Sequence, residues 1–409
     1  MSVPKLRFKG FTGDWEQQKL GDITSKIGSG KTPAGGSDAY VESGTPLIRS
    51  QNVHDDMVDL SDVVFIDDET NKAMENSIVS ANDVLLNITG ASIGRSAVYK
   101  GVGSANVNQH VCIIRPVAGY FSDFVQLHIS SADGQKQIDS SQAGGAREGL
   151  NFQQISKFEF AFPSYEEQSK IGGYFRGLDN IISLHQRKCE ALKELKRGML
   201  QKMFPKEGAK VPAFRFKGFT GDWEQRKLSE LGEILTGSTP STANEEYYSE
   251  DGIPWVTPTD IESNLISDTP KKLSEKGIKV GRVVPANTIL CTCIASIGKN
   301  ALLTVNGSFN QQINSLTPNA NNDAYFLLTE SEIWSSNMKR MAAAGTMQIV
   351  NKKEFSEIKT IVPSKNEQIQ IGDYFRNIDS LITLHQRKCD ALKELKKGML
   401  QKMFPEAQK

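Results

Sequence analysis

The pattern of hydrophobic and polar positions predicts a long helix over residues 166–204, a stretch that contains no proline. A line with seven-residue spacing runs along it and comprises Ile171, Leu178, His185, Leu192 and Met199. A mixed line lies three residues later, at Tyr174, Ile181, Lys188, Leu195 and Lys202. The stripe is widened by Phe175, Ile182, Cys189 and Met203. This pattern is typical of a helix that packs on another helix. Ser164 with Glu167 resembles a capping box at its start, and Pro205 ends it.

The same pattern returns near the C-terminus and predicts a second helix. Its seven-residue line comprises Ile371, Ile378, His385, Leu392 and Met399. Two such stripes in one chain have a partner in each other, so we expect an antiparallel pair of helices, each about 55–60 Å long. His185 and His385 stand at the middle of each line, where they either lie together and fix the register or remain solvated beside an imperfect seam.

The chain is duplicated. Residues 8–20 read FKGFTGDWEQQKL and residues 216–228 read FKGFTGDWEQRKL, with twelve of thirteen positions identical. Residues 184–205 and 384–405 agree at twenty of twenty-two positions. Between these anchors the copies share only a skeleton, as expected for two modules that bind different targets. The alternative is a recent duplication whose identical segments have no functional reason.

The segments 10–165 and 214–365 have the pattern of mixed α/β domains, with buried strands expected at 83–88 and 288–290. The hydrophobic fraction is 38%, and no apolar run approaches the about 20 residues of a membrane span. The first nine residues lack the apolar core of a signal peptide. Five cysteines do not suggest a disulfide framework. We therefore expect a cytoplasmic protein with no membrane partner.

Charge and motifs exclude several classes of function. Lysines and arginines balance aspartates and glutamates at 48 each, which argues against a uniformly basic nucleic-acid coat. The Gly-Ser-Gly-Lys-Thr run at 28–32 has Ser25 where a phosphate-binding loop needs glycine. Cys291 and Cys293 are expected to be buried strand residues, with a zinc site as the weaker alternative. Common enzyme signatures are absent from the sequence, so no catalytic or metal site is predicted.

Polar, glycine-rich loops at matched positions in the two copies are the candidate functional sites. Arginine, asparagine and glutamine can make bidentate contacts to base edges, and glycine allows the backbone to approach a phosphate. An ordinary solvated turn is the alternative for any one loop, but the matched placement favours a shared role. The candidate DNA contacts are Lys31, Thr32, Arg49, Gln51, Asn52, Arg95, Arg147, Thr239, Thr257, Thr259, Lys271, Lys272, Lys299, Thr346 and Gln348.

The layout resembles the specificity subunit of type I restriction–modification enzymes. The resemblance covers essentially the whole chain. The motifs that carry it are Gly-Asp-Trp-Glu at 13–16 and 221–224, Leu85 to Gly94 followed by Asn108-Gln109, and Tyr-Phe-Arg at 174–176 and 374–376. The second copy departs from the pattern where Ile294 stands in place of Gly90, so the turn there need not have the same shape.

The resemblance implies two target-recognition domains joined by two long helices that form an antiparallel coiled coil. Each domain would read one half of a gapped, non-palindromic site in double-stranded DNA. The helices would set the gap and dock two modification subunits, which bind S-adenosylmethionine and methylate adenine. Restriction subunits would add cleavage that depends on ATP and Mg. None of this chemistry lies in the present chain, which is expected to be non-catalytic and to hold no cofactor.

The predicted boundaries follow the repeats. The recognition domains span 1–165 and 214–365, the helices 166–205 and 366–405, the linker 206–213 and the tail 406–409. We expect Arg147→Ala and Gln348→Ala to weaken one half-site each, by about 1–3 kcal/mol. A two-headed adaptor that binds a protein or a glycan would use the same doubled layout, and an unfamiliar enzyme is a further alternative.

Overall fold

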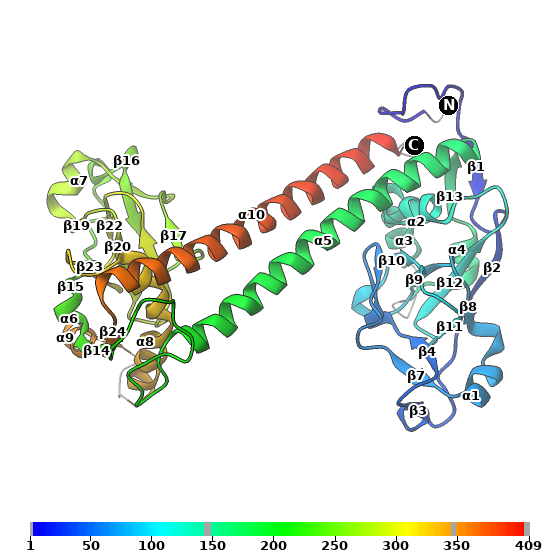
Figure 1. Cartoon of the computed structure of the whole chain (residues 1–409). Helices are drawn as coiled ribbons and strands as arrows, with labels where there is room; N and C mark the ends of the chain where they lie inside the picture. Colours follow the sequence, from blue (N-terminus) through cyan, green and yellow to red (C-terminus); the bar gives the residue numbers. More distant parts are fainter. Residues whose placement is uncertain (1–2, 143–148, 345–348, 405–409) are drawn as a thin grey trace. The chain divides into compact units, whose positions relative to one another are not determined.

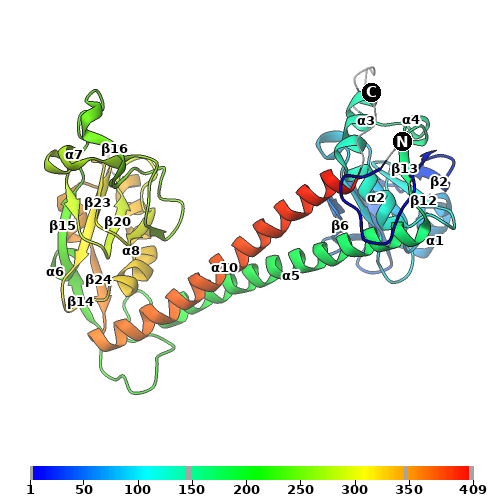
Figure 2. The ribbon, with the colours of Figure 1, turned by 90° about the horizontal axis from the view of Figure 1, so that it is seen from above.

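The computed structural model describes residues 3–142, 149–344 and 349–404 (Figures 1 and 2). The chain forms two compact units. Unit 1 comprises Met1–Gln186 with Arg387–Lys409, and unit 2 comprises Arg187–Gln386. The two predicted long helices are present as α5 (Tyr165–Met203) and α10 (Lys365–Met403). Each unit therefore contains a globular body, the first half of one long helix and the second half of the other.

The body of unit 1 is built on two main sheets. The four-stranded antiparallel sheet has the order β10 (Ser96–Val98), β9 (Val84–Asn87), β12 (Val111–Pro116) and β2 (Thr24–Ser29). The five-stranded sheet has the order β3 (Tyr40–Val41), β7 (Val64–Ile66), β4 (Thr45–Ile48), β11 (Ala105–Val107) and β8 (Ile78–Val79). Two further pairs are β1 (Glu16–Lys19) with β13 (Glu159–Phe162), and β5 (Val53–His54) with β6 (Met57–Val58). All four residues of β9 are buried, as the predicted strand at 83–88 requires.

Helices cover and connect these sheets. The α-helices of this body are α1 (Asp68–Ala73), α2 (Ser122–Ser130), α3 (Ala132–Gln142) and α4 (Phe152–Ser156). Its short 3₁₀ turns are η1 (Gly36–Ala39), η2 (Ser50–Asn52), η3 (Glu75–Ser77) and η4 (Gly90–Ser92). Residues of α2 such as Phe124 and Ile129 are fully buried, and they pack in one core cluster with Val84 and Leu86 of β9.

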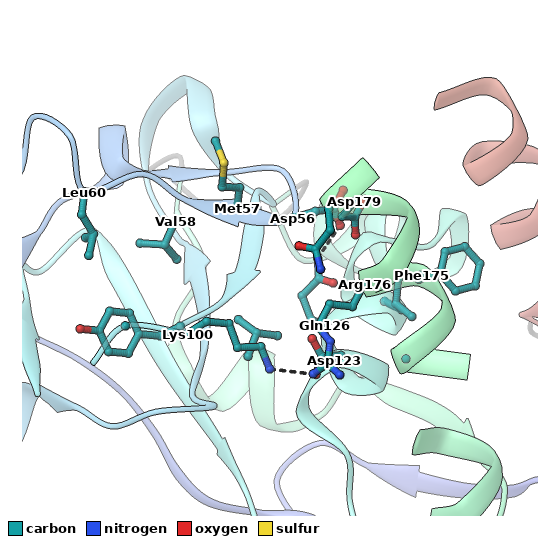
Figure 3. A pocket seen from close by; sticks show the side chains of 16 residues that line it. Asp56, Met57, Val58, Leu60, Lys100, Asp123, Gln126, Phe175, Arg176 and Asp179 are labelled. Carbon is teal, nitrogen blue, oxygen red and sulfur yellow. Dashed lines mark hydrogen bonds and ion pairs between the residues drawn. The ribbon is translucent and has the colours of Figure 1, made fainter. Parts of the chain in front are cut away.

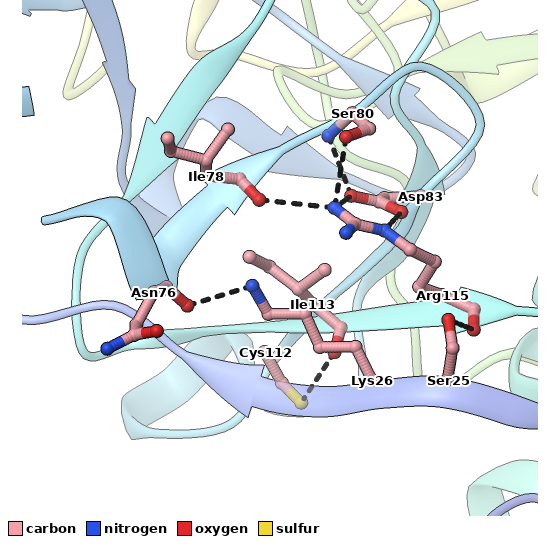
Figure 4. A network of polar contacts seen from close by, with 9 residues as sticks. All are labelled: Ser25, Lys26, Asn76, Ile78, Ser80, Asp83, Cys112, Ile113 and Arg115. Atoms are coloured by element: carbon pink, nitrogen blue, oxygen red, sulfur yellow. Dashed lines mark hydrogen bonds and ion pairs between the residues drawn. The ribbon is translucent and has the colours of Figure 1, made fainter. Parts of the chain in front are cut away.

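A polar network ties the two sheets of unit 1 together (Figure 4). The Arg115 guanidinium on β12 donates two hydrogen bonds of 2.7 Å to the buried carboxylate of Asp83. It also donates to the carbonyl of Ile78 on β8 and to the hydroxyl of Ser80. Lys26 on β2 donates to the carbonyl of Asn76. These bonds satisfy a carboxylate that would otherwise be costly to bury.

The body of unit 2 repeats this plan. Its antiparallel sheet has the order β15 (Gly232–Thr236), β23 (Ile313–Pro318), β20 (Thr288–Thr292) and β21 (Asn300–Leu303), and β17 (Leu265–Ile266) adds a parallel edge. The second sheet has the order β18 (Lys272–Leu273), β16 (Tyr248–Val256), β22 (Gly307–Phe309) and β19 (Val283–Val284). The remaining pair is β14 (Glu224–Lys227) with β24 (Lys359–Val362). The helices are α6 (Leu228–Leu231), η5 (Glu245–Tyr247), α7 (Glu275–Val280), α8 (Ala324–Ala344) and α9 (Lys352–Glu357).

The backbone hydrogen bonds correct one detail of the sequence alignment. The amide of Thr292 donates to the carbonyl of Lys299, as the amide of Asn87 does to Arg95 in unit 1. Thr292 is thus the counterpart of Asn87, and the following turn is one residue shorter in unit 2. Ile294 therefore occupies the position of Thr89 and not that of Gly90. Cys291 and Cys293 occupy the positions of Leu86 and Ile88, and both cysteines are buried. In the shorter turn Ala295 adopts the left-handed conformation, with φ of 62°.

The end of each long helix completes a core that belongs to the other sequence copy. In unit 1, Met403 and Phe404 pack with Trp15 and Phe175. In unit 2, Met203 and Phe204 pack with Trp223 and Phe375, and Phe204 stacks on Phe326. Both joints are built from the two long repeated segments and the Tyr-Phe-Arg motif. This shared packing gives a physical reason for the near identity of the repeated segments.

Within each unit the two helix segments run antiparallel. In unit 1 the Tyr174 hydroxyl lies 3.1 Å from the sulfur of Met399, and Asp179 pairs with Lys396. In unit 2 the Cys189 thiol contacts Gln386, and Lys196 pairs with Asp379. In both units the residue numbers rise along one segment as they fall along the other.

The mixed line of the predicted stripe is wrong. Ile181 and Leu195 are 45% and 46% exposed. Burial instead follows the residues that had been expected only to widen the stripe, and they alternate with the first line at spacings of three and four residues, as in a heptad seam. This second buried line is Phe175, Ile182, Cys189 and Met203, with Phe375, Cys389, Lys396 and Met403 in α10. Lys196, which was not among the residues predicted to widen the stripe, lies on the same line and is half-buried. The line Ile171, Leu178, His185, Leu192 and Met199 and its α10 counterpart are buried or half-buried.

The capping of the long helices differs in part from the predicted box. The Ser164 hydroxyl accepts a hydrogen bond from the amide of Glu167, as expected. The Glu167 carboxylate, however, is buried against the guanidinium of Arg7 at 2.6 and 2.7 Å. Arg215 and Glu367 repeat this bidentate pair in unit 2 at 2.7 and 2.8 Å. The arginine directly before each first repeated segment therefore pairs with the first turn of a long helix.

Candidate DNA interface

Four loops of unit 1 meet at one edge of its sheets, where β2, β4 and β9 end and β12 begins. The Thr32 hydroxyl donates to the side-chain carbonyl of Gln109 at 2.7 Å. The Gln109 amide lies 3.0 Å from His110, whose other ring nitrogen lies 2.6 Å from the hydroxyl of Thr89. Thr32 and Gln109 are exposed. The loops after β2 and β9 and the loop before β12 are thus joined by a chain of side-chain hydrogen bonds.

The close approach of these loops requires glycine at position 30. A β-carbon on Gly30 would lie 1.5 Å from the carbonyl oxygen of Val107, an impossible contact. Gly30 instead donates its amide to the carbonyl of Asn108. The glycine-rich run that resembles part of a phosphate loop therefore has a packing role, while Lys31 directly after it is exposed.

The same arrangement recurs in unit 2. The Thr239 hydroxyl donates to the side-chain carbonyl of Gln311, the counterpart of the Thr32–Gln109 pair. The amide of Asn310 donates to the carbonyl of Val256, and the amide of Cys293 donates to the carbonyl of Gln312. Thr239 and Gln311 are exposed. The threonine–glutamine pair is therefore a shared feature of two bodies that otherwise differ in their surface side chains.

The loop after β4 has one candidate that cannot reach DNA. Asn52 is fully buried, and its side chain accepts from the amide of Arg49 and donates to Asp62 at 2.7 Å. Because both ends of this amide are used inside the fold, Asn52 shapes the loop and is not an accessible contact. Gln51 is exposed and donates to Asp62, and Arg49 is half-buried with a hydrogen bond to the Asp62 carbonyl.

The corresponding loop of unit 2 is shaped by a carboxylate. Asp260, the counterpart of Asn52, accepts from the amide and the hydroxyl of Thr257 at 2.7 and 2.6 Å. The Thr257 hydroxyl also lies 2.8 Å from that of Thr259. Thr259 is exposed and Thr257 half-buried. The two loops share a backbone turn but present different side chains, an arginine and a glutamine in one and two threonines in the other.

One exposed cation follows the matched turn in each body. Arg95 and Lys299 come directly after Gly94 and Gly298, whose φ angles of 89° and 79° lie in the left-handed region that favours glycine. Gly94 and Gly298 donate their amides to the carbonyls of Asn87 and Thr292. The turn therefore holds a positive charge at the same edge in both units.

Two further candidates lie away from this edge. Lys271 and Lys272 lie at the edge strand β18, where Lys272 pairs with Asp268 at 2.9 Å and the Lys271 amine lies over the ring of Tyr248. The other three candidates, Arg147, Thr346 and Gln348, lie outside the described residues. Their described neighbours Gly149 and Ile349 form backbone bridges with Thr89 and Ile294, at the same edge as the loops above.

Other features of the described chain bear on its chemistry. Cys291 packs with its sulfur 3.4 Å from that of Met338, and burial raises the pKa of its thiol. Within residues 3–142, 149–344 and 349–404 there is no group of three acidic, histidine or cysteine side chains arranged to hold a metal ion. The same residues include no helix both long and apolar enough to cross a bilayer.

Sequence reasoning missed two groups of residues at this site. Gln109 and Gln311 belong to the repeated Asn-Gln motif, but only the structure shows that each accepts from a threonine three positions into another loop. The second group surrounds a cavity of about 420 Å³ beside the β5–β6 hairpin, lined by Asp56, Gln126, Phe175 and Asp179 among others (Figure 3). The sequence signal that could have found this group is Lys396, a charged residue at a seam position of α10 that pairs with Asp56 and Asp179.

Comparisons with known proteins agree with these observations. Residues 12–194 and 220–394 each match the family model described as the type I restriction modification DNA specificity domain. The MjaX type I restriction enzyme specificity subunit of Methanocaldococcus jannaschii is 23% identical over 402 residues, which cover 95% of this chain and 92% of that protein. The HindI specificity subunit of Haemophilus influenzae is 34% identical over 149 residues, 35% of this chain and 32% of that protein.

Solved structures extend the similarity to the fold. The crystal structure of a type I restriction–modification system S subunit from M. genitalium matches 99% of this chain and 100% of its own, with a TM-score of 0.71 and 13% identity. At this identity the likeness shows the fold alone. The alternative of a two-headed adaptor for proteins or glycans gains no support from these similarities.

Proposed function

Because the chain belongs to the family of type I restriction modification DNA specificity domains and carries that domain twice, we propose that it is the DNA-specificity subunit of a type I restriction–modification complex. Each body reads one half of a gapped, non-palindromic site in duplex DNA. We assign the recognition domains to 1–165 and 214–365, and the spacer to α5 and α10 acting as an antiparallel coiled coil.

One observation carries this proposal. The two bodies share the order of four strands in each main sheet and the threonine–glutamine hydrogen bond between loops, yet other exposed side chains at the shared edge differ. A common scaffold with different polar side chains is what two readers of different base sequences need, because amide and guanidinium groups distinguish base edges by hydrogen bonding. The exposed Arg95 and Lys299 suit phosphates, which position a protein without reading sequence.

The long helices offer matched docking surfaces for partner subunits. Each helix exposes two large apolar side chains that are three residues apart and lie on one face of the helix, within one unit. The two sets are Ile181 and Leu184 in α5, and Leu381 and Leu384 in α10. Exposed apolar patches mark interaction sites. We assign these two sets to two modification subunits.

The chemistry of such a complex resides in its partners. The modification subunits bind S-adenosylmethionine and methylate adenine, and the restriction subunits use ATP and Mg. This chain contributes the choice of sequence and the separation of the two half-sites. It acts beside cytoplasmic DNA as a non-catalytic subunit.

The experiment that tests this function lengthens both helices together. Seven residues inserted after Gln186 and seven after Gln386 preserve the heptad seam and lengthen each helix by about 10 Å. We expect the gap between half-sites to grow by about three base pairs, while each half-site keeps its sequence. The measurement is sequencing of methylated adenines in cells that carry the chain and its methyltransferase.

A matched control places the same seven residues in the linker 206–213, which leaves both helices intact. The control should methylate the original site with the original gap. An unchanged gap in the helix variant, or an altered half-site sequence, would contradict the proposal.

A further inference from the structure

A buried lysine in unit 1 joins the helix pair to the loop that carries candidate DNA contacts. Lys396 on α10 is 9% exposed, and its amine lies 2.6 Å from the carboxylates of both Asp179 on α5 and Asp56. Asp56 closes the β5–β6 hairpin, directly after the loop that holds Arg49 and Gln51. Its second carboxylate oxygen accepts from the buried amide of Gln126 on α2 at 2.9 Å. The cluster thus joins α10, α5, α2 and the β5–β6 hairpin.

A second lysine makes the corresponding cluster in unit 2. Lys196 on α5 pairs with Asp379 on α10 at 3.0 Å and with Glu332 on α8 at 2.9 Å. Burial disfavours the charge on Lys196, but the two carboxylates outweigh it, so its pKa is raised. Asp379 also accepts from the Tyr325 hydroxyl at 2.9 Å and from the side-chain amide of Asn264 at 3.3 Å.

The residues that reach these clusters from the loops hold equivalent positions. Asp56 follows Arg49 by seven residues, and Asn264 follows Thr257 by seven. The lysine and the helix aspartate are supplied by the repeated helices and are the same in both units. The loop partner differs: in unit 1 it is a carboxylate on the lysine, and in unit 2 it is an amide on the aspartate.

The backbone at Asp56 shows that the contact holds the hairpin in one conformation. Its φ of 66° lies in the left-handed region, which costs a non-glycine residue free energy unless the surroundings compensate. The bonds to Lys396 and Gln126, together with the amide bond to the Ser96 carbonyl, supply that compensation. The hairpin position is therefore coupled to the helix and not set by the loop alone.

We propose that Asp56 and Asn264 are positioning residues for DNA recognition, which fix each reading loop to the lysine–aspartate pair of the helices. This inference rests on the proposed function and adds to it a physical link between the reading loops and the helices that dock the modification subunits. Each link acts on one half-site, because each cluster lies wholly within one unit.

The test uses the full chain assembled with its modification subunits and DNA duplexes that carry the complete site or single-base changes in either half. Asp56→Asn removes the ionic bond to Lys396 while keeping a residue that tolerates the left-handed backbone. Asp55→Asn, at the exposed neighbouring position, is the charge-matched control. We expect Asp56→Asn to lower discrimination about tenfold in one half-site only, because the buried lysine loses one of its two carboxylate partners and the hairpin loses its ionic bond to the helix, and Asp55→Asn to leave both halves unchanged.

The mirror variant identifies the other half. Asn264→Ala, with Glu262→Gln as its exposed control, should lower discrimination in the half-site that Asp56→Asn leaves intact. A general loss of stability would weaken binding to all duplexes equally and leave the ranking of bases unchanged. Equal loss on every duplex, or unchanged discrimination in both halves, would overturn the inference. If the unmutated complex shows no sequence preference, the proposed function itself fails, so the two failures are distinguishable.

Discussion

The two bodies place different chemistry at the same buried position between neighbouring strands. In unit 1, Asp83 before β9 and Arg115 on β12 form a bidentate ion pair at 2.7 Å. In unit 2, Thr288 on β20 and Thr317 on β23 occupy these positions, and their hydroxyls lie 2.9 Å apart. In both bodies the two side chains satisfy each other's polar groups between neighbouring strands. The comparison shows that the fold requires a matched pair there, while the kind of pair is free to change.

A second exchange of buried polar residues lies on the helices α2 and α8. His128 on α2 and Glu330 on α8 stand at equivalent places, 202 residues apart like Phe124 and Phe326. His128 lies 2.8 Å from the carbonyl of Ala161 on β13, and Glu330 accepts from Thr360 on β24. Burial lowers the pKa of His128 to about 3 and raises that of Glu330 to about 8. Both groups are uncharged at neutral pH, which is the property that the buried position demands.

The largest expected effect comes from breaking the ion pair on one side only. Arg115→Met leaves the Asp83 carboxylate buried without its cation and should destabilise unit 1 by roughly 3–5 kcal/mol. Thr317→Val should cost unit 2 only about 1 kcal/mol, because Thr288 still donates to the carbonyl of Pro285. Hydrogen exchange in increasing urea, read on peptides from β9 and β20 by mass spectrometry, measures the two units separately.

A double variant makes this comparison sharper. Asp83→Thr with Arg115→Thr imports the hydroxyl pair of unit 2 into unit 1, and should recover most of the stability lost in Arg115→Met. Equal costs for Arg115→Met and Thr317→Val, or a double variant as unstable as the single one, would contradict the view that matching matters more than charge.

The two units should respond to pH in opposite directions. The unfolded Glu330 carboxyl loses its proton above about pH 4.5, but the folded group keeps its proton until about pH 8. Unit 2 therefore loses stability as pH rises through this window, by on the order of 4 kcal/mol. The unfolded His128 takes up a proton below about pH 6.5, while the folded ring resists until about pH 3, so unit 1 loses stability as pH falls.

Neutral replacements test these slopes. Glu330→Gln should remove the fall in unit 2 between pH 4.5 and 8, and His128→Gln should remove the fall in unit 1 at acid pH. Urea midpoints from hydrogen exchange at pH 5, 6, 7 and 8 would show this. Parallel pH profiles for the two units would mean that other groups dominate.

The long helices were predictable from sequence because a seven-residue spacing of apolar residues, bounded by prolines, indicates a helix whatever the helix packs against. The seam was only half predictable. Ile181 and Leu195 are as apolar as true seam residues, and Lys196 and Lys396 are charged. Hydropathy alone therefore predicts that the two apolar residues lie in the seam and that the two lysines lie in solvent, the reverse of what the structure shows. Tertiary ion pairs with Asp379 and Asp179 decide the burial of the lysines, and nothing local in the sequence shows them.

The site was predictable to a similar extent. Matched loop positions favoured a shared role for the polar residues, but only the structure shows that several of these loops lie at one edge, where the ends of neighbouring strands meet. The sequence could not separate Gln51, which is exposed, from Asn52, which is buried one residue later. That choice depends on Asp62, which lies in a different part of the loop and binds both side chains.

The smallest expected effect concerns the exposed cation that both units share. If Arg95 and Lys299 contact phosphates, Arg95→Ala and Lys299→Ala should each weaken binding on all sequences alike and lower the slope of log affinity against log salt by about one. Such equality would set these residues apart from Gln51, whose loss should alter discrimination in one half-site. A change in base preference at one position in Arg95→Ala but not in Lys299→Ala would show instead that the planar guanidinium of unit 1 reads a base, and the two matched turns would then differ in function as well as in side chain.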